Sequence, residues 1–171
     1  MNKIIVNVGG ALCFNDKQYR CALGKGGARI DKQEGDGATP VGCFPIRKVF
    51  YRLDNLGNPP ETIFPTQALA QDDGWSNDVN LPEYNQLVKI PYNGSHEKLW
   101  RNDHLYDIVV VLGYNDNPPI TGKGSAIFMH IAREDYAPTA GCVALAREDL
   151  LEILKTADAA TQVCVQEQRT V

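Results

Sequence analysis

A histidine and a cysteine lie on either side of a short loop in the last third of the chain. His130 stands near the end of an apolar run, and Cys142 follows the loop directly after Gly141. A cysteine becomes a useful nucleophile when an imidazole takes its proton or stabilises its thiolate. The histidine precedes the cysteine, which excludes a papain-like layout, where the order is reversed. The pair predicts an acyl-transfer site with Cys142 as the nucleophile and His130 as its base.

Gly141 adds a further requirement of such a site, a place for the oxyanion. Because glycine has no side chain, it permits unusual backbone angles and a close approach of the substrate. Backbone N–H groups around Gly141 and Cys142 are therefore expected to converge on the oxyanion. A cysteine beside a glycine in a loop is also a common form of inert, buried small side chain. The spacing alone leaves both interpretations open.

The elements that hold these residues are mostly strands. Short segments of clustered or alternating β-branched and apolar residues, bounded by turn signals, predict strands at 4–8, 18–23, 107–112, 126–132 and 161–166. The continuous apolar runs at 107–112 and 126–132 are typical of central strands that are covered on both faces. His130 would then lie near the end of a core strand.

One clear helix is expected, from about Arg147 to Ala157, soon after the cysteine. Its apolar residues recur at helical spacing, and two acidic residues occupy its first turn. The middle of the chain, residues 55–94, is rich in Pro, Gly, Asn and Asp and predicts long loops with one short helix. The sequence therefore predicts a mainly β fold with few helices.

Composition limits the class of protein. At 171 residues the chain fits one domain, spanning 1–171. Hydrophobic residues make up 43% and charged residues 22%, close to the globular average, so neither a disordered chain nor a membrane protein is indicated. A formal net charge of −4 argues against a nucleic-acid binder, which presents a basic face to phosphates. Small molecules or peptides are the expected partners.

The cysteines and the N-terminus bear on the cellular compartment. Five cysteines are an odd number, so at least one thiol must be free in the monomer. A disulfide among Cys13, Cys21, Cys43 and Cys164 stays open, although a chain of this size does not need one. The apolar run that follows the first residues is too short for a signal-peptide core or a membrane span. Either the protein stays inside the cell or a leader is missing from the sequence.

The residues around the pair resemble the signature of the L,D-transpeptidase catalytic (YkuD-like) family. In that signature a histidine precedes, by a short loop, a Gly-Cys motif that contains serine or threonine, as His130 precedes Thr139-Ala140-Gly141-Cys142-Val143. The upstream segment 32–46, which contains DGATPVGCF, looks like the family's segment reading roughly DGATPxGxF. The resemblance implies a single-domain sandwich or barrel of mixed sheets with a few short helices.

The resemblance also implies a reaction. Cys142 would attack the amide between an L-centre and a D-amino acid in a peptidoglycan stem peptide, with His130 as its base. The resulting thioester would pass its acyl group to an amine of another stem, to a free D-amino acid or to water. Family members use no metal or organic cofactor and work in the cell envelope or periplasm.

The chain departs from the family pattern at two positions, and other residues are candidates to compensate. Ala140 and Ala144 stand where the family has a histidine or similar residue and an arginine. Arg133 or Arg147 could replace that arginine as a substrate contact, although a solvated surface position beside an acidic neighbour is the more ordinary interpretation of each.

Two further histidines are candidate site residues. His96 and His104 are candidates for binding a stem carboxylate or orienting the catalytic pair, with a structural role as the alternative. A zinc site made from these two histidines and the catalytic pair is a further alternative, but their spacing matches no known local pattern.

The rival function is a non-catalytic module that binds cell-wall or other peptides on the same fold. Thiol reactivity separates the two hypotheses. An enzyme is expected to have a Cys142 that alkylates much faster than the other four cysteines and loses this reactivity in His130→Ala. A binding module is expected to show no such contrast.

Overall fold

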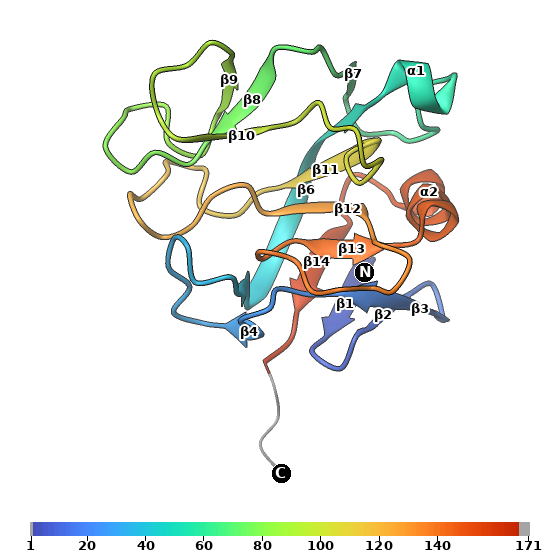
Figure 1. Cartoon of the computed structure of the whole chain (residues 1–171). Coiled ribbons are helices and arrows are strands. Elements are labelled where there is room, and N and C mark those ends of the chain that lie inside the picture. The colour runs from blue at the N-terminus through green and yellow to red at the C-terminus, as the bar shows by residue number, and fades with distance from the viewer. Residues whose placement is uncertain (1, 168–171) are drawn as a thin grey trace.

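The fold is built on one large sheet that closes on itself. Its strands are β1 (Lys3–Asn7), β2 (Ala11–Phe14), β3 (Lys17–Ala22), β6 (Gly42–Tyr51), β7 (Thr66–Ala68), β11 (Ile108–Leu112), β12 (Phe128–Ile131), β13 (Val143–Leu145) and β14 (Gln162–Val165). The computed structural model describes residues 2–167 and orders this sheet β11-β12-β13-β3-β2-β1-β14-β6-β7. A further pairing of β11 with β6 closes the run into a barrel, and β7 extends it beside β6 (Figure 1).

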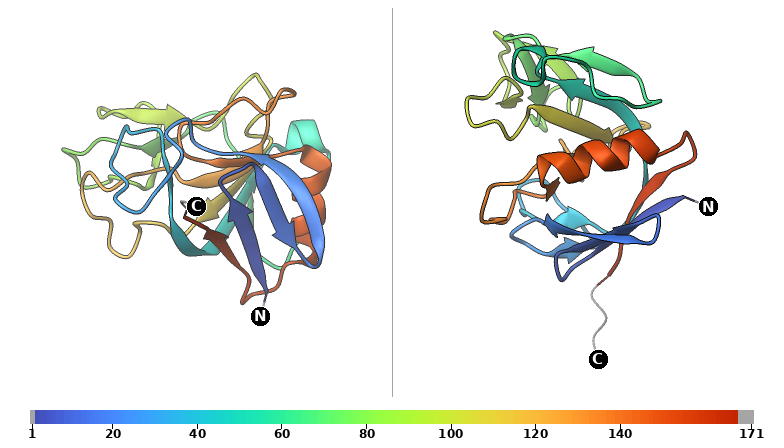
Figure 2. Two further views of the ribbon diagram at one scale, coloured as in Figure 1. Left: turned by 90° about the horizontal axis from the view of Figure 1, so that it is seen from below. Right: turned by 90° about the vertical axis from the view of Figure 1, so that its right-hand side faces the viewer.

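Two smaller sheets and two helices surround the barrel. β8 (Asp73–Ser76) lies between β9 (Leu87–Lys89) and β10 (His96–Lys98), and β4 (Ala28–Arg29) pairs with β5 (Thr39–Pro40). The helices are α1 (Leu53–Leu56) and α2 (Arg147–Thr156). Figure 2 shows α2 along one side of the molecule, between the β1–β3 layer and the strands at the opposite end. The mainly β fold expected from the sequence is confirmed.

The alternation of side chains along β11 explains why its sequence is apolar throughout. Every second residue from Ile108 belongs to the main core cluster, which collects side chains from the barrel strands and α2. Val109 and Val111 belong to a second cluster on the other face, together with Trp75 of β8. The strand is therefore buried on both faces, as its continuous apolar run predicts.

The predicted helix after the cysteine is confirmed as α2. Its apolar residues Leu150, Ile153 and Leu154 are fully buried in the main core, and Glu148 and Asp149 occupy its first turn. Acidic side chains there complement the positive end of the helix dipole. Within residues 2–167, no helix has the length and apolar character needed to cross a membrane.

The prediction of long loops for residues 55–94 was wrong in part. This segment contains β7, β8 and β9, and the short helix α1 begins just before it at Leu53. These strands are only three or four residues long. An alternating pattern cannot stand out over so few residues, so the sequence signal was too weak to find them.

One of the possible disulfides is present. Cys43 of β6 and Cys164 of β14 stand opposite each other in antiparallel strands, with Cα atoms 4.0 Å apart, and their sulfurs are bonded. The other cysteines, Cys13, Cys21 and Cys142, are free thiols. The candidate nucleophile is therefore available for chemistry.

Candidate active site

Parallel pairing of β12 with β13 brings Cys142 next to the strand of His130. In the register of these strands His130 pairs with Ala144, and Cys142 immediately precedes β13. The N–H of Phe128 donates a hydrogen bond to the Cys142 sulfur, 3.4 Å away. Because side chains alternate along a strand, Met129 enters the main core while its neighbours Phe128 and His130 face the other side. Cys142 and His130 both line one cavity of about 360 Å³.

The His130 imidazole is fixed in one tautomer. Its Nδ1 lies 2.9 Å from the carbonyl oxygen of Ile131. Since a carbonyl can only accept, Nδ1 must carry the proton, and Nε2 is left as the basic nitrogen. Burial lowers the pKa of His130 to about 4, so the ring is neutral at pH 7. A neutral imidazole with an unoccupied Nε2 is the state that a general base needs.

The Cys142 side chain rests as a protonated thiol. Its S–H donates to the carbonyl oxygen of Ala126, 3.3 Å away. Burial raises the pKa of the Cys142 thiol to about 12. A thiolate is therefore rare at rest, and attack by this sulfur requires proton transfer to a base during the reaction.

Gly141 shapes the loop that presents the cysteine. Its φ is +138°, and a Cβ placed there would lie 2.8 Å from the carbonyl oxygen of Ala38, so only glycine fits. The Gly141 N–H donates to the Thr139 hydroxyl at 3.1 Å, and that hydroxyl donates to the Cys142 carbonyl at 2.6 Å. The N–H of Gly141 is thus engaged within the loop. The N–H of Cys142 has no acceptor among residues 2–167, which leaves it available for an oxyanion.

The same loop is joined to the chain that follows β3. The Lys25 N–H donates to the Thr139 carbonyl at 2.8 Å, and the Thr139 N–H donates to the Leu23 carbonyl at 2.9 Å. Gly24 and Thr139 form a bridge of the parallel type. The loop between His130 and Cys142 therefore has a defined place in the fold.

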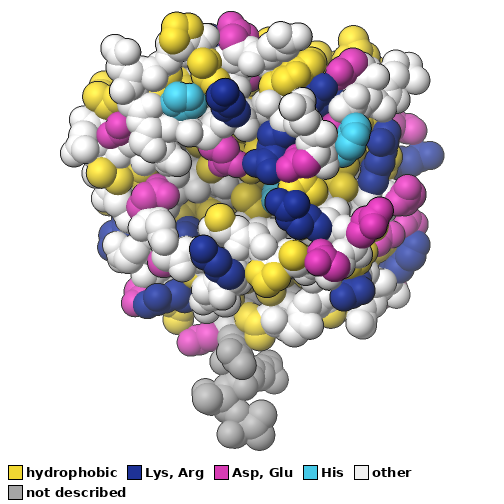
Figure 3. Space-filling model, in the orientation of Figure 1, with side chains coloured by type: hydrophobic (Ala, Val, Ile, Leu, Met, Phe, Trp, Pro, Cys, Tyr) yellow, Lys and Arg dark blue, Asp and Glu magenta, His cyan; other side chains and the backbone are white. Residues whose placement is uncertain are grey.

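The cavity carries charges of both signs. Its charged lining residues are Lys25, Lys32, Glu34, Glu97, Arg101 and Arg133. Figure 3 shows Lys and Arg side chains beside Asp and Glu side chains in the middle of this face of the molecule. Lys32 is buried and paired with Asp36 at 2.8 Å, and Arg101 is paired with Asp103. Such a lining suits a ligand that itself carries both charges.

The two arginines predicted as substitutes for the family arginine lie in different places. Arg133 is exposed, lines the cavity and forms no ion pair with another described residue. Arg147 lies outside the lining, with its guanidinium 3.5 Å from the carbonyl oxygen of Asn55. Ala144, at the position of the family arginine, also lines the cavity. Of the two cations, only Arg133 is placed to meet a ligand there.

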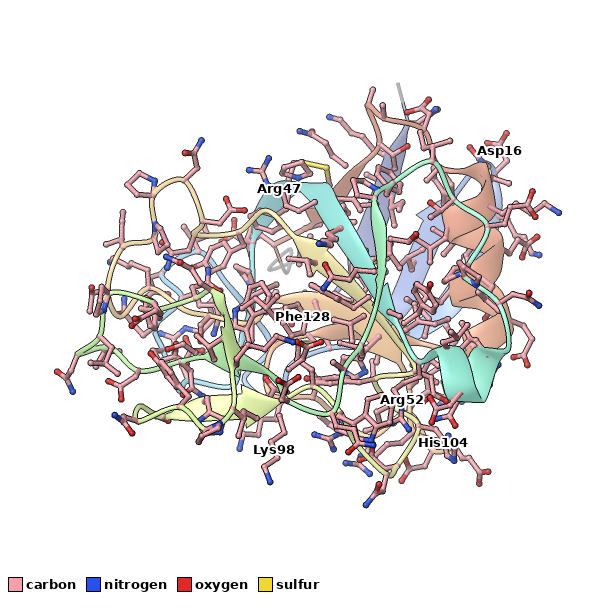
Figure 4. The ribbon with its side chains drawn as sticks, turned by 90° about the horizontal axis from the view of Figure 1, so that it is seen from above. Asp16, Arg47, Arg52, Lys98, His104 and Phe128 are labelled. Atoms are coloured by element: carbon pink, nitrogen blue, oxygen red, sulfur yellow. A yellow bond between two sulfur atoms is a disulfide. The ribbon has the colours of Figure 1, made fainter. Side chains whose placement is uncertain are left out.

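His96 and His104 are not brought to the cavity. His96 Nδ1 lies 2.8 Å from the Gly94 carbonyl, and its neighbour Glu97 takes the inward position on β10. His104 is exposed and lies 3.0 Å from an oxygen of Asp107. Figure 4 shows it at the edge of the molecule near Arg52, whereas Phe128 lies near the centre. The expected substrate contacts of both histidines therefore lose their basis.

The alternative zinc site does not assemble either. Residues 2–167 contain no group of three His, Cys, Asp or Glu side chains placed to hold a metal ion. His130 and Cys142 line the cavity, whereas His96 and His104 do not.

Glu97, Tyr106 and Asn77 also line the cavity, although the sequence assigned none of them an individual role. The sequence offers only a weak signal of their roles. Glu97 and Tyr106 belong to the charged segment 95–107, and Asn77 is an amide in a loop. That signal does not say which side chains turn inward, because the answer depends on how β10 pairs with β8.

One protein family matches nearly the whole chain. The model of the L,D-transpeptidase catalytic domain (YkuD) matches residues 3–165. No curated protein sequence shows a match.

Solved structures supply weaker likenesses. The chain is similar to L,D-transpeptidase 3 from Mycobacterium tuberculosis, with 13% identity, a TM-score of 0.47, and coverage of 97% of this chain and 61% of that one. It is also similar to an L,D-transpeptidase from Mycobacterium smegmatis, with 12% identity, a TM-score of 0.45, and coverage of 97% and 58%. For the helical cell shape determining protein Pgp2 from Campylobacter jejuni the values are 14%, 0.46, 99% and 48%.

The chain thus spans between about half and three fifths of the length of these structures, whose likeness carries no conclusion about activity. The family model, by contrast, covers nearly the whole chain. On that match, the chain belongs to the L,D-transpeptidase catalytic domain (YkuD) family.

Proposed function

We propose that this protein transfers the acyl group of a peptidoglycan stem peptide through a thioester on Cys142, with His130 as the base. This is the chemistry of an L,D-transpeptidase or L,D-carboxypeptidase. The observation that carries the proposal is the placement of a neutral, tautomerically fixed His130 in the same cavity as the free thiol, on the strand beside it. Membership of the family supports the peptide substrate.

The burial of both groups suits a mechanism in which the proton moves during the attack. Nε2 of His130 takes the proton from Sγ as the sulfur adds to the amide carbonyl carbon. The Cys142 N–H, which has no acceptor among the described residues, stabilises the oxyanion. As the C–N bond breaks, the imidazolium protonates the departing amine of the D-amino acid. An acceptor amine or water then attacks the thioester, and its proton returns through Nε2 to the sulfur.

Arg133 replaces the family arginine, whose position is occupied by Ala144 in this chain. Its exposed guanidinium lines the cavity and is free to bind a substrate carboxylate. The reaction takes place in the cell envelope, where the peptidoglycan substrate lies.

A second candidate function is a peptide-binding module without catalysis. The observation that favours it is the buried, hydrogen-bonded state of the Cys142 thiol, whose pKa is raised to about 12 by burial. In that case the cavity holds a peptide and the cysteine serves as a small buried side chain.

Mass spectrometry of a disaccharide-tetrapeptide incubated with the protein tests the proposal. The wild type is expected to release the terminal D-amino acid and to carry an acyl adduct on Cys142. Cys142→Ala is expected to be inactive, and His130→Ala to be slower by at least about a hundredfold. Cys21→Ala is the matched control, because Cys21 is also a free, buried cysteine but lies outside the cavity. Binding of the tetrapeptide by every variant without release would favour the binding module.

A further inference from the structure

The cavity contains a carboxylate that the transfer mechanism above does not use. Glu97 is the middle residue of β10 and pairs directly with Trp75 of β8. Residues that pair across two strands share a face, and Trp75 belongs to the second core cluster. Glu97 therefore points inward, where it lines the cavity together with His130 and Cys142.

Tyr106 contacts both the Glu97 carboxylate and the His130 imidazole. The Tyr106 hydroxyl donates a hydrogen bond to Oε1 of Glu97. The ring of the same tyrosine packs edge-on against His130, with 5.2 Å between the ring centroids. The second oxygen of Glu97 makes no hydrogen bond or ion pair with the described residues. Burial raises the pKa of the Glu97 carboxyl, so a cation that bound the free oxygen would offset the cost of its burial.

Two further acceptors point to the kind of ligand. Asn77 also lines the cavity, and its Oδ1 is buried with no hydrogen-bond partner within residues 2–167. Glu34 lines the cavity too, with its Oε1 held by the Tyr84 and Ser125 hydroxyls at 2.7 and 2.6 Å. Glu34 and Glu97 thus line the same cavity, and each has one oxygen held by a hydroxyl. A group with several donors and a positive charge suits a cavity lined by these acceptors, and a primary ammonium is such a group.

We propose that Glu97 binds the ammonium group of the acyl acceptor and takes its proton, with Glu34 and Asn77 completing the site. The inference rests on the proposed function and assigns the residue that receives the acceptor amine. The ammonium gives one proton to Glu97, and the neutral amine attacks the thioester carbonyl carbon. Its second proton passes to Nε2 of His130 as the new C–N bond forms. The C–S bond then breaks, the sulfur takes that proton, and Glu97 returns its own proton to solvent.

Binding of simple probes tests the ammonium site without any turnover. D-Alaninamide carries the ammonium, and D-lactamide replaces it with a neutral hydroxyl. Both are titrated by NMR into the Cys142→Ala protein and into the same protein with Glu97→Gln. D-Alaninamide is expected to bind, and to bind roughly tenfold or more weakly after Glu97→Gln. D-Lactamide is expected to bind neither protein measurably.

The chain offers a matched control in Glu83→Gln. Glu83 also accepts a hydrogen bond from a tyrosine hydroxyl, that of Tyr92 at 3.3 Å, but does not line the cavity. The substitution removes the same charge, and D-alaninamide binding is expected to stay unchanged. Equal binding of the two probes, no binding of D-alaninamide, or equal losses in the two variants would overturn the inference.

The partition of the acyl-enzyme separates this inference from the proposed function. With a tetrapeptide donor and a D-amino acid acceptor, Glu97→Gln is expected to lower the ratio of exchange product to hydrolysis product roughly tenfold or more. The ratio is compared at equal amounts of Cys142 adduct, so that a change in the rate of acylation does not enter it. If the Glu97→Gln enzyme is active and its ratio of exchange to hydrolysis product is unchanged, the role of Glu97 is refuted and the proposed function still stands. Loss of all cleavage in the wild type with intact D-alaninamide binding would refute the proposed function and leave the ammonium site.

Discussion

The ring of Tyr106 lies edge-on against the imidazole of His130, with 5.2 Å between the centroids and 67° between the ring planes. The imidazole is thus held by two contacts of different kinds, a packed aromatic ring and the Ile131 carbonyl that fixes its tautomer. The ring contact sets where Nε2 lies, and the carbonyl sets which nitrogen is basic. These two contributions can be separated by mutation.

Removing the Tyr106 ring is expected to slow acylation of Cys142 by about tenfold or more, because a small misplacement of a base is costly to rate. Tyr106→Leu should show this loss, whereas Tyr106→Phe keeps the ring and should acylate within about threefold of the wild type. The measurement is the rate of adduct formation on Cys142, followed by intact mass. Tyr92→Leu is the control, because Tyr92 makes a similar edge contact with His96 at 5.8 Å outside the cavity. Equal rates for Tyr106→Leu and Tyr106→Phe would contradict the positioning role.

Alkylation of the free protein is expected to label Cys13 before Cys142. Cys13 is partly exposed, whereas Cys142 is buried with a pKa raised to about 12 by that burial. At pH 7 this leaves roughly one Cys142 thiol in 10⁵ ionised. The sequence alone predicts the opposite order for an enzyme, with Cys142 labelled much faster than the other cysteines. Peptide mapping after brief iodoacetamide treatment measures the order, and fast labelling of Cys142 that depends on His130 would restore the earlier expectation.

Activity is expected to persist at acid pH further than an ordinary histidine allows. The base must be neutral, and burial lowers the pKa of His130 to about 4. The kcat/KM value for a tetrapeptide should therefore fall only as the pH approaches about 4. Stability should fall between pH 6.5 and about 4, because the unfolded chain binds this proton first. Parallel thermal melts separate the two effects, and an activity limb centred near pH 6.5 in folded protein would contradict the burial argument.

The sequence was most informative where residue type alone decides structure. The long apolar run of β11 and the periodic face of α2 were both predicted, because burial on two faces or on one leaves a direct pattern. The sequence singled out His130 and Cys142 by their chemistry and by the short loop between them, and both line one cavity.

The rest of the site depends on pairings between distant segments. The inward turn of Glu97, and the outward turn of its neighbour His96, follow from the pairing of β10 with β8. The Cys43–Cys164 bond likewise follows from the contact of β14 with β6. These registers cannot be read from a local sequence pattern. The sequence therefore predicted His96, and not Glu97, as the residue of β10 that reaches the cavity.

Gly141→Ala is expected to damage both stability and activity. The added Cβ would lie 2.8 Å from the Ala38 carbonyl oxygen at a φ of +138°, and strain of this kind costs about 1–3 kcal/mol. The loop that carries Cys142 must shift, so transfer should fall about tenfold or more. Gly122→Ala is the control, since its φ is +84° but the space around it is open. Urea unfolding and tetrapeptide turnover measure both effects, and similar activity in the two variants would argue against a shaping role for Gly141.

Arg133→Gln is expected to raise KM for the tetrapeptide about tenfold while kcat changes little, because Arg133 is expected to bind a carboxylate equally in the ground and transition states. Arg147→Gln should leave both constants unchanged, since Arg147 lies outside the cavity. Steady-state kinetics of the two variants supply the measurement. An equal effect of the two substitutions would remove Arg133 from the site.

The bridge between Thr139 and Gly24 has a consequence for how ligands come and go. The loop that ends in Cys142 begins beside His130. Within it, Thr139 forms backbone hydrogen bonds with Leu23 and Lys25. An outward movement of this loop would separate the Cys142 sulfur from His130 and break these hydrogen bonds. This wall of the cavity is therefore expected to stay in place while a ligand enters or leaves.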